Sequence, residues 1–382
     1  MNGSNLPAFH VLAKPTGAKC NLNCKYCFYL EKEELYPKSD FKMGNEVLEE
    51  YIKQLFEGHR TREVAVAWQG GEPTLMGLDF FKRSVELVQK YKRPDQVPEY
   101  TLQTNGTLLD DEWCVFFAEN NFLIGLSLDG PGELHDTNRM NKGGAGSFDE
   151  VIRGLEFLKK HRVDFNILCT INSCNVREPL MVYKFFRDDV GAEFVQFIPI
   201  VEWMGNELTP ESVGAKDFGK FLCDIFDEWV NRDIGEVYVQ HFDAALANRY
   251  GTPPGICVFS ETCGTAVALE HNGDVYSCDH FVNPQHKIGN ILKDDLADVV
   301  SGEEQFKFGQ DKRNKLPEDC LNCEIRFACH GGCPKNRDKL GKNVLCEGYK
   351  IFFEHTREPM KKMARLLREG RAPREMMDSK KV

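Results

Sequence analysis

The stretch CNLNCKYCFY, residues 20–29, places three cysteines within eight positions and follows the third with two aromatic residues. Three thiolates do not complete a structural zinc site, which takes four protein ligands, and the next cysteine in the chain is Cys114. They can hold three irons of a four-iron, four-sulfur cubane, for which cysteine thiolate is the usual ligand. The fourth iron would then be open. A zinc knuckle that borrows a fourth ligand, or three incidental buried thiols, is the alternative.

The composition describes a globular, acidic chain. It has 382 residues, of which 42% are hydrophobic and 28% charged, and a formal net charge of -11. Nucleic-acid affinity rests on basic surface, so no nucleic-acid partner is expected. No apolar run approaches the roughly 20 residues that cross a bilayer, and the first 15 residues lack the pattern of a secretion signal. We therefore expect a cytoplasmic protein without membrane contact, in which fifteen cysteines indicate metal or redox chemistry.

Short apolar strands alternate with amphipathic helices over the first half of the chain, which is typical of βα units around a parallel sheet. Strands are expected over residues 8–14, 63–69, 99–105, 122–129, 164–171 and 193–200. Helices are expected over residues 45–56, 78–91 and 147–161. Six such units predict an α/β fold with a partial, TIM-like (β/α)6 barrel, whose open side could admit a large substrate.

The predicted domains follow a change in composition near residue 240, after which Gly, Pro and Cys become more frequent. We expect a barrel domain over 1–240, a cysteine-rich domain over 241–354 and a basic helical tail over 355–382. The tail carries nine Lys or Arg against four Asp or Glu, in a pattern that predicts an exposed helix. Such a helix is either simply solvated or docks an acidic partner.

Three polar segments follow predicted strands, namely WQGGEPT (68–74), LQTNGT (102–107) and LSLDGP (126–131). In parallel sheets the ligand site forms at the carboxyl ends of the strands. Together with the C-x3-C-x2-C spacing, the segment GGEPT resembles the radical S-adenosylmethionine superfamily. The resemblance implies that S-adenosylmethionine chelates the open iron. It further implies cluster ligands Cys20, Cys24 and Cys27, a methionyl site at Gly70, Gly71 and Glu72, and contacts to the cofactor's carboxylate and ribose from Ser127 and Arg139.

Eight further cysteines follow, spaced C-x5-C-x14-C from residue 257 and C-x2-C-x5-C-x3-C-x12-C from residue 320. Eight thiols suffice for two four-iron clusters or for two structural zinc sites, and spacing alone does not decide between them. The order resembles the SPASM extension of radical enzymes that modify peptides. The resemblance implies one auxiliary cluster on Cys257, Cys263, Cys278 and Cys333. It implies a second on Cys320, Cys323, Cys329 and Cys346.

Within that group, the segments above and GDVYSCDHF (273–281) resemble anaerobic sulfatase-maturating enzymes. The resemblance implies a radical oxidoreductase with three [4Fe-4S] clusters that converts a Cys or Ser of a sulfatase polypeptide to Cα-formylglycine. Asp279 would take the proton of the substrate thiol or hydroxyl, and an auxiliary cluster is a plausible electron acceptor. Tyr29, Gln69, Gln103 and Asn105 stand at strand ends where they could bind the peptide backbone or satisfy loop amides. A flavodoxin or ferredoxin is the expected reductant.

Two other functions compete with this interpretation. A SPASM enzyme that crosslinks ribosomal peptides commonly has a separate peptide-recognition domain at its N-terminus, whereas the first predicted strand here begins within about ten residues. A zinc-binding scaffold protein would leave GGEPT and the three-cysteine loop unexplained.

Overall fold

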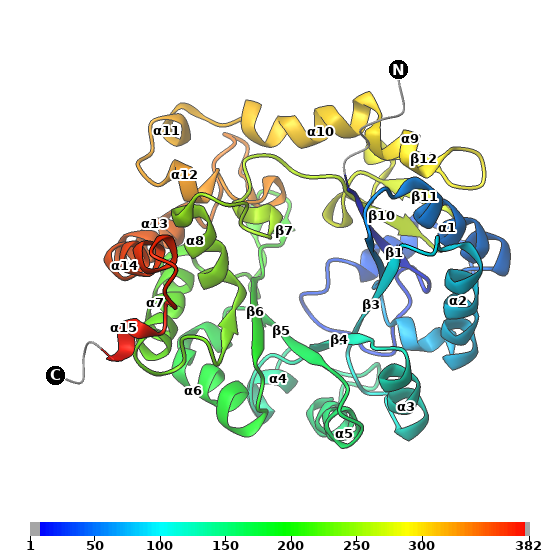
Figure 1. Cartoon of the computed structure of the whole chain (residues 1–382), viewed down its shortest axis with the longest axis horizontal. Helices are drawn as coiled ribbons and strands as arrows, with labels where there is room; N and C mark the ends of the chain where they lie inside the picture. Colours follow the sequence, from blue (N-terminus) through cyan, green and yellow to red (C-terminus); the bar gives the residue numbers. More distant parts are fainter. Residues whose placement is uncertain (1–7, 379–382) are drawn as a thin grey trace. The chain divides into compact units, whose positions relative to one another are not determined.

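The computed structural model describes residues 8–378, which form two compact units (Figure 1). Unit 1 comprises the described part of Met1–Ser127 with Arg139–Phe165 and Gly264–Gly309. Unit 2 comprises Leu128–Asn138, Asn166–Cys263 and the described part of Gln310–Val382.

Unit 1 is built on strands in the order β12-β11-β10-β1-β2-β3-β4. The strands are β1 (His10–Lys14), β2 (Glu63–Trp68), β3 (Val97–Thr104), β4 (Leu123–Ser127), β10 (Ala266–Glu270), β11 (Asp274–Tyr276) and β12 (Lys287–Asn290). Pairing is parallel from β10 through β1, β2 and β3 to β4, and antiparallel from β10 to β11 and from β11 to β12. The carboxyl ends of β1 to β4 therefore point to one edge of the sheet.

Most of the α-helices of unit 1 bury an apolar face. The helices of this unit are α1 (Asn45–Gly58), α2 (Leu78–Tyr91), α3 (Asp111–Glu119), α5 (Phe148–Lys160), α9 (Leu296–Ser301) and the start of α10 (Glu303–Asn314). Figure 1 shows α1 and α2 lying along the outer side of β1 to β3. On α1 the buried residues recur every three or four positions, and α3 begins where the Asp110 side chain accepts a hydrogen bond from the Trp113 amide at 3.0 Å.

Unit 2 holds the strands β5 (Phe165–Ile171), β6 (Phe194–Pro199) and β9 (Tyr238–Val239), which pair in parallel, and a short hairpin of β7 (Trp203–Met204) and β8 (Glu207–Leu208). Its helices are α4 (Gly132–Asp136), α6 (Pro179–Lys184), α7 (Ala215–Arg232), α8 (Gln240–Tyr250), α11 (Glu318–Leu321), α12 (Arg326–Cys329), α13 (Cys346–His355), α14 (Arg357–Arg368) and α15 (Glu375–Asp378).

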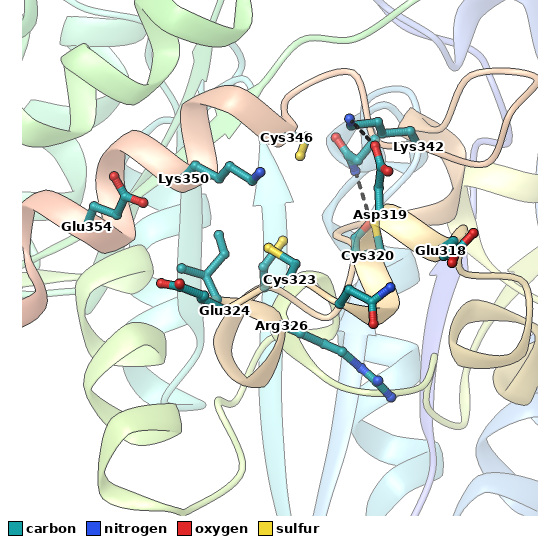
Figure 2. A pocket seen from close by; sticks show the side chains of 15 residues that line it. Glu318, Asp319, Cys320, Cys323, Glu324, Arg326, Lys342, Cys346, Lys350 and Glu354 are labelled. Atoms are coloured by element: carbon teal, nitrogen blue, oxygen red, sulfur yellow. Dashed lines mark hydrogen bonds and ion pairs between the residues drawn. The ribbon is translucent and has the colours of Figure 1, made fainter.

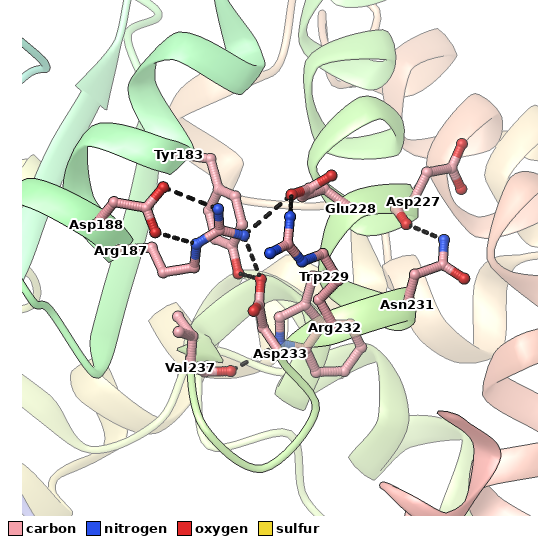
Figure 3. Close-up of polar contacts among 10 residues, drawn as sticks. All are labelled: Tyr183, Arg187, Asp188, Asp227, Glu228, Trp229, Asn231, Arg232, Asp233 and Val237. Atoms are coloured by element: carbon pink, nitrogen blue, oxygen red, sulfur yellow. Dashed lines mark hydrogen bonds and ion pairs between the residues drawn. The ribbon is translucent and has the colours of Figure 1, made fainter. Parts of the chain in front are cut away.

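A cluster of charges in unit 2 fixes the end of α6 to the end of α7 (Figure 3). Arg187 lies on a π-helical turn and donates hydrogen bonds to Asp188, Glu228 and Asp233 at 2.7–3.0 Å. The Tyr183 hydroxyl donates to Asp233 at 2.7 Å. The hydrogen bond from Arg187 lowers the pKa of Glu228, so the Glu228 carboxylate stays ionised. The network of charges therefore holds the two helix ends together.

The contact between α7 and α13 depends on two glycines, Gly219 and Gly348. A Cβ atom at Gly219 would lie 2.6 Å from the carbonyl oxygen of Gly348. We expect Gly219→Ala to lower the free energy of unfolding by about 1–3 kcal/mol, because backbone atoms must shift to admit the methyl group. Gly132→Ala, where nothing lies within 4 Å of the added atom, is the matched control. Equal melting temperatures of the two variants in anaerobic thermal unfolding would contradict this account of the contact.

The six strands and three helices predicted from the sequence are confirmed, with ends that shift by at most two residues. A helix is also present in the predicted tail, as α14, but one of its faces is buried through Met360, Met363 and Leu366. The expectation of an exposed helix is therefore correct only for its basic face. Residues 379–382 of that tail lie outside the described residues. No helix within residues 8–378 is long and apolar enough to cross a membrane.

Candidate active site

The three cysteines of the first cluster lie together in the loop after β1, in unit 1. The amide of Cys27 donates to the carbonyl of Cys24 at 3.1 Å, and the amide of Leu22 donates to Cys20 Sγ at 3.4 Å. Burial, the charge of Glu72 and the neighbouring thiolates raise the pKa of Cys20 to about 12. Three thiolates at this place need a bound cation to balance them, and the irons of a cubane supply that charge. The donor set therefore fits an iron–sulfur cluster.

The GGEPT segment lies directly against this cysteine loop. The Gly71 amide donates to the Gly17 carbonyl at 2.8 Å, and the Glu72 amide donates to the Lys19 carbonyl at 2.9 Å. A Cβ atom at Gly71 would stand 2.1 Å from the Lys19 oxygen, and one at Gly70, whose φ is +128°, would stand 2.9 Å from the Gly17 oxygen. Only glycine permits this approach of two backbone segments.

Glu72 ties the same segment to the end of β3. Its side chain is fully buried and accepts hydrogen bonds from the Thr74 amide at 3.0 Å, the Thr104 hydroxyl at 2.8 Å and the Asn105 amide at 2.8 Å. Burial raises the pKa of Glu72, although these hydrogen bonds oppose the rise. The carboxylate is thus turned into the protein, and its oxygens are occupied by this chain.

The strand-end amides predicted to bind substrate form a row at one edge of the sheet. Gln69 Nε2 donates to Gln103 Oε1 at 2.8 Å, and Lys14 Nζ donates to Gln69 Oε1 at 2.7 Å. Asn105 Nδ2 donates to Asn21 Oδ1 at 2.9 Å and lies 3.8 Å from Cys20 Sγ. The carboxyl ends of β1, β2 and β3 therefore bring these side chains to the cysteine loop.

Asp279 belongs to the same edge, through an ion pair with Lys14 of β1. Lys14 is 2% exposed, while the side chain of Asp279 is 18% exposed. Burial raises the pKa of Asp279, but the positive charges of Lys14 and His280 outweigh burial and hold that pKa below its usual value. Asp279 is therefore an ionised carboxylate with a proton-accepting oxygen close to the strand ends.

Tyr29 is buried beside this pair. Its hydroxyl donates to Glu270 of β10, and the Lys14 ammonium lies 4.4 Å from the centre of its ring. Burial and the charge of Glu270 raise the pKa of Tyr29 well above the usual value. The hydroxyl is thus occupied within the protein. Lys14 and Glu270 were missed by the sequence analysis, and the available signal was a charged residue at the end of an otherwise apolar strand.

The two residues expected to face the cofactor's carboxylate and ribose also lie in unit 1. Ser127 ends β4 and is 6% exposed. Arg139 is 8% exposed, and its guanidinium carbon lies 5.7 Å from the ring centre of Tyr26, which stands between Cys24 and Cys27. The structure therefore brings Arg139 to the cysteine loop and leaves Ser127 at the strand edge.

In unit 2 the four cysteines expected to hold one auxiliary cluster line a single cavity of about 680 Å³ (Figure 2). They are Cys320, Cys323, Cys329 and Cys346. Burial, together with the charges of the other three thiols, raises the pKa of Cys329 to about 12. Lys342 and Lys350 line the same cavity and supply positive charge.

The cysteines of the other auxiliary set are divided between the two units of the chain. Cys257, Cys263 and Cys333 lie in unit 2, where burial raises the pKa of Cys263 to about 11 and the two other thiols act in the same direction. Cys278 lies in unit 1, directly before Asp279.

Among residues 8–378, no three His, Cys, Asp or Glu side chains are grouped as ligands of a single metal ion. Zinc would need its sulfur ligands within about 2.3 Å of one point.

Two family models match the chain. The radical SAM superfamily model matches residues 15–185, and the SPASM model, an iron–sulfur cluster-binding domain, matches residues 257–324. The fold and the cysteine loop therefore define a radical S-adenosylmethionine enzyme with an α/β, partial barrel-like parallel sheet and a C-terminal SPASM domain.

Similar proteins identify the family within the radical S-adenosylmethionine enzymes to which this chain belongs. The chain is 42% identical to a serine-type anaerobic sulfatase-maturating enzyme of Bacteroides thetaiotaomicron, over 97% of this chain and 95% of that protein. It is 36% identical to a cysteine-type enzyme of Clostridium perfringens, over 92% and 96%. A solved structure of anSMEcpe with bound AdoMet and Cp18Cys peptide superposes with a TM-score of 0.86 at 34% identity, covering 94% of this chain and 100% of that one. The chain belongs to the anaerobic sulfatase-maturating enzymes.

Enzymes of this family convert a Cys or Ser to formylglycine, bind S-adenosylmethionine and carry three [4Fe-4S] clusters. The function, enzyme class and cofactors expected from the sequence are therefore confirmed. This family membership excludes the two alternatives, a zinc-binding scaffold protein and an enzyme that crosslinks ribosomal peptides.

Proposed function

We propose that this chain oxidises the β-carbon of a Cys or Ser in an extended sulfatase segment at the sheet edge of unit 1. The proposal is carried by one observation: an ionised carboxylate, Asp279, is held by the buried Lys14 at the edge where β1 to β3 end beside the cysteine loop. Cys20, Cys24 and Cys27 would hold the cluster there. When bound, the cluster and S-adenosylmethionine supply a radical that abstracts a hydrogen atom.

Asp279 accounts for the proton of this oxidation. Converting CH2–SH to C=S removes one hydrogen atom, one proton and one electron, and water then hydrolyses the thioaldehyde; for Ser the aldehyde forms directly. Asp279 takes the proton from the thiol or hydroxyl, because it is charged at neutral pH and partly open to solvent. Lys14 keeps the carboxylate oriented. An auxiliary cluster held by the cysteines of the SPASM domain would accept the electron, and a flavodoxin or ferredoxin in the cytoplasm would reduce the enzyme.

The remaining sequence-predicted residues have separate tasks. Gly70, Gly71 and the backbone of Glu72 bind the methionyl amino group, while Arg139 and Ser127 bind the carboxylate and ribose. Gln69, Gln103 and Asn105 hold the peptide backbone, while Tyr29, whose hydroxyl donates to Glu270, packs against the Lys14 ammonium. The chain divides near residue 240, the SPASM domain covers residues 241–354, and the two cysteine sets named above hold the auxiliary clusters.

The test uses reconstituted, anaerobic protein with S-adenosylmethionine, a reductant and two peptides that differ only in Cys or Ser at the first position of a Cys-x-Pro-x-Arg segment. We expect a trappable aldehyde at that position, formed together with 5'-deoxyadenosine and absent in Cys24→Ala. Mass spectrometry identifies the residue. Formation of 5'-deoxyadenosine with both peptides unchanged would refute the substrate assignment and leave the radical chemistry intact.

A further inference from the structure

Arg337 of unit 2 is anchored on backbone that belongs to both auxiliary cysteine sets. Its Nε donates to the carbonyl of Gly331 at 3.4 Å, and Gly331 lies midway in sequence between Cys329 of one set and Cys333 of the other. A Cβ atom at Gly331 would stand 3.0 Å from Arg337 Nη2. The guanidinium therefore lies against the segment that joins the two sets.

A second buried cation holds Arg337 from the other side. Arg337 Nη2 donates to the carbonyl of Lys312 at 2.9 Å. The Lys312 ammonium, on a residue that is 1% exposed, donates to the carbonyls of Cys257 at 2.5 Å, Val258 at 3.1 Å and Ser260 at 2.5 Å. Three acceptors match the three N–H donors of a charged ammonium. Lys312 thus fixes the turn that carries Cys257 and positions the guanidinium.

The charge of Arg337 reaches thiols of both sets. Burial raises the pKa of Cys263 to about 11, and Lys312 and Arg337 oppose that rise. Burial also raises the pKa of Cys320, and Arg337 opposes that rise as well. Neither Arg337 nor Lys312 forms an ion pair with a carboxylate anywhere in the described part of the chain. Burial lowers the pKa of Arg337, and thiols of both sets, led by Cys320 and Cys263, act against that lowering.

We propose that Arg337 is a positioning residue for electron transfer: a fixed positive charge shared by the two auxiliary clusters, which raises the reduction potential of both. Reduction adds a negative charge to a cluster, and a nearby uncompensated cation stabilises the reduced form. Raising both potentials together keeps the two clusters able to accept electrons in series. The proposal rests on the assignment of clusters to these cysteines, and it does not depend on the peptide substrate.

The test is a redox titration of the holoenzyme without peptide, followed by electron paramagnetic resonance. In Arg337→Gln we expect the equilibrium constant for reduction of each auxiliary cluster to fall at least tenfold, which is about 59 mV for a one-electron couple. The cluster of unit 1 is the internal reference and should keep its potential. Arg337→Lys, which retains the charge, should lie close to the unmodified enzyme.

Arg313→Gln is the matched control, because Arg313 is an exposed arginine of unit 2 paired with Glu261, so its charge is already balanced. It should shift no potential. Unchanged auxiliary potentials in Arg337→Gln, or an equal shift in Arg337→Lys, would overturn the proposal. Loss of an auxiliary cluster from Arg337→Gln, measured as iron and sulfide per chain, would assign the residue a structural role and also overturn it. Peptide oxidation enters none of these readouts, so failure here is distinct from failure of the proposed function.

Discussion

Replacing Asp279 by Asn is expected to lower the rate of aldehyde formation by about 10²-fold or more, the usual contribution of a positioned general base. The amide keeps the size of the side chain but neither accepts the substrate proton nor forms the ion pair with Lys14. Formation of 5'-deoxyadenosine should persist, because the cysteine loop and the GGEPT segment are untouched. Single-turnover assays that quantify both products measure the two effects separately.

The control for this prediction is Asp298→Asn, which changes an exposed aspartate of α9 in the same unit. It should leave both products unchanged. If Asp279→Asn formed aldehyde at the rate of the unmodified enzyme, the carboxylate would not be the proton acceptor. If it lost 5'-deoxyadenosine as well, Asp279 would act on the cofactor site instead.

Gly71→Ala is expected to abolish most of the radical chemistry at its first step. The added methyl carbon would stand 2.1 Å from the Lys19 oxygen and 2.5 Å from the Lys19 carbonyl carbon, so the backbone next to Cys20 must move. Because displacements of about 1 Å in a reacting site cost on the order of 10²-fold in rate, we expect a loss of that size in S-adenosylmethionine cleavage. Chromatography of 5'-deoxyadenosine under excess reductant gives the rate.

The matched variant is Gly44→Ala in the same unit, where the added atom meets nothing within 4 Å. It should cleave S-adenosylmethionine as the unmodified enzyme does. Gly71→Ala should retain the iron bound by Cys320, Cys323, Cys329 and Cys346, since these cysteines lie in unit 2 and the substitution lies in unit 1. Full activity of Gly71→Ala would show that the close approach of the two backbone segments is not required.

Much of this architecture is visible in the sequence, because the signals are local. The period of the apolar residues predicts β1 to β6, and the spacing of Cys20, Cys24 and Cys27 predicts the cluster loop. The placement of GGEPT against that loop follows from the rule that strand ends share an edge.

The contacts that shape the site are long-range and could not be predicted from periodicity. β10 pairs with β1, so Glu270 meets Tyr29 and the segment after β11 brings Asp279 to Lys14. No local pattern reports which later strand extends the sheet beside β1. The buried face of α14 was missed for a related reason: its methionines and leucines alternate with basic residues, and only packing in unit 2 distinguishes that face from an exposed one.

The most direct test of the central claim is transfer of a label from the substrate's β-carbon. A sulfatase-type peptide carrying deuterium only on the β-carbon of the target Cys or Ser is incubated anaerobically with the reduced holoenzyme and S-adenosylmethionine. The account predicts one deuterium in the 5'-deoxyadenosine, recovered by mass spectrometry in step with formation of the aldehyde. Unlabelled 5'-deoxyadenosine beside a formed aldehyde, or label transfer only from a peptide deuterated at the α-carbon, would contradict it.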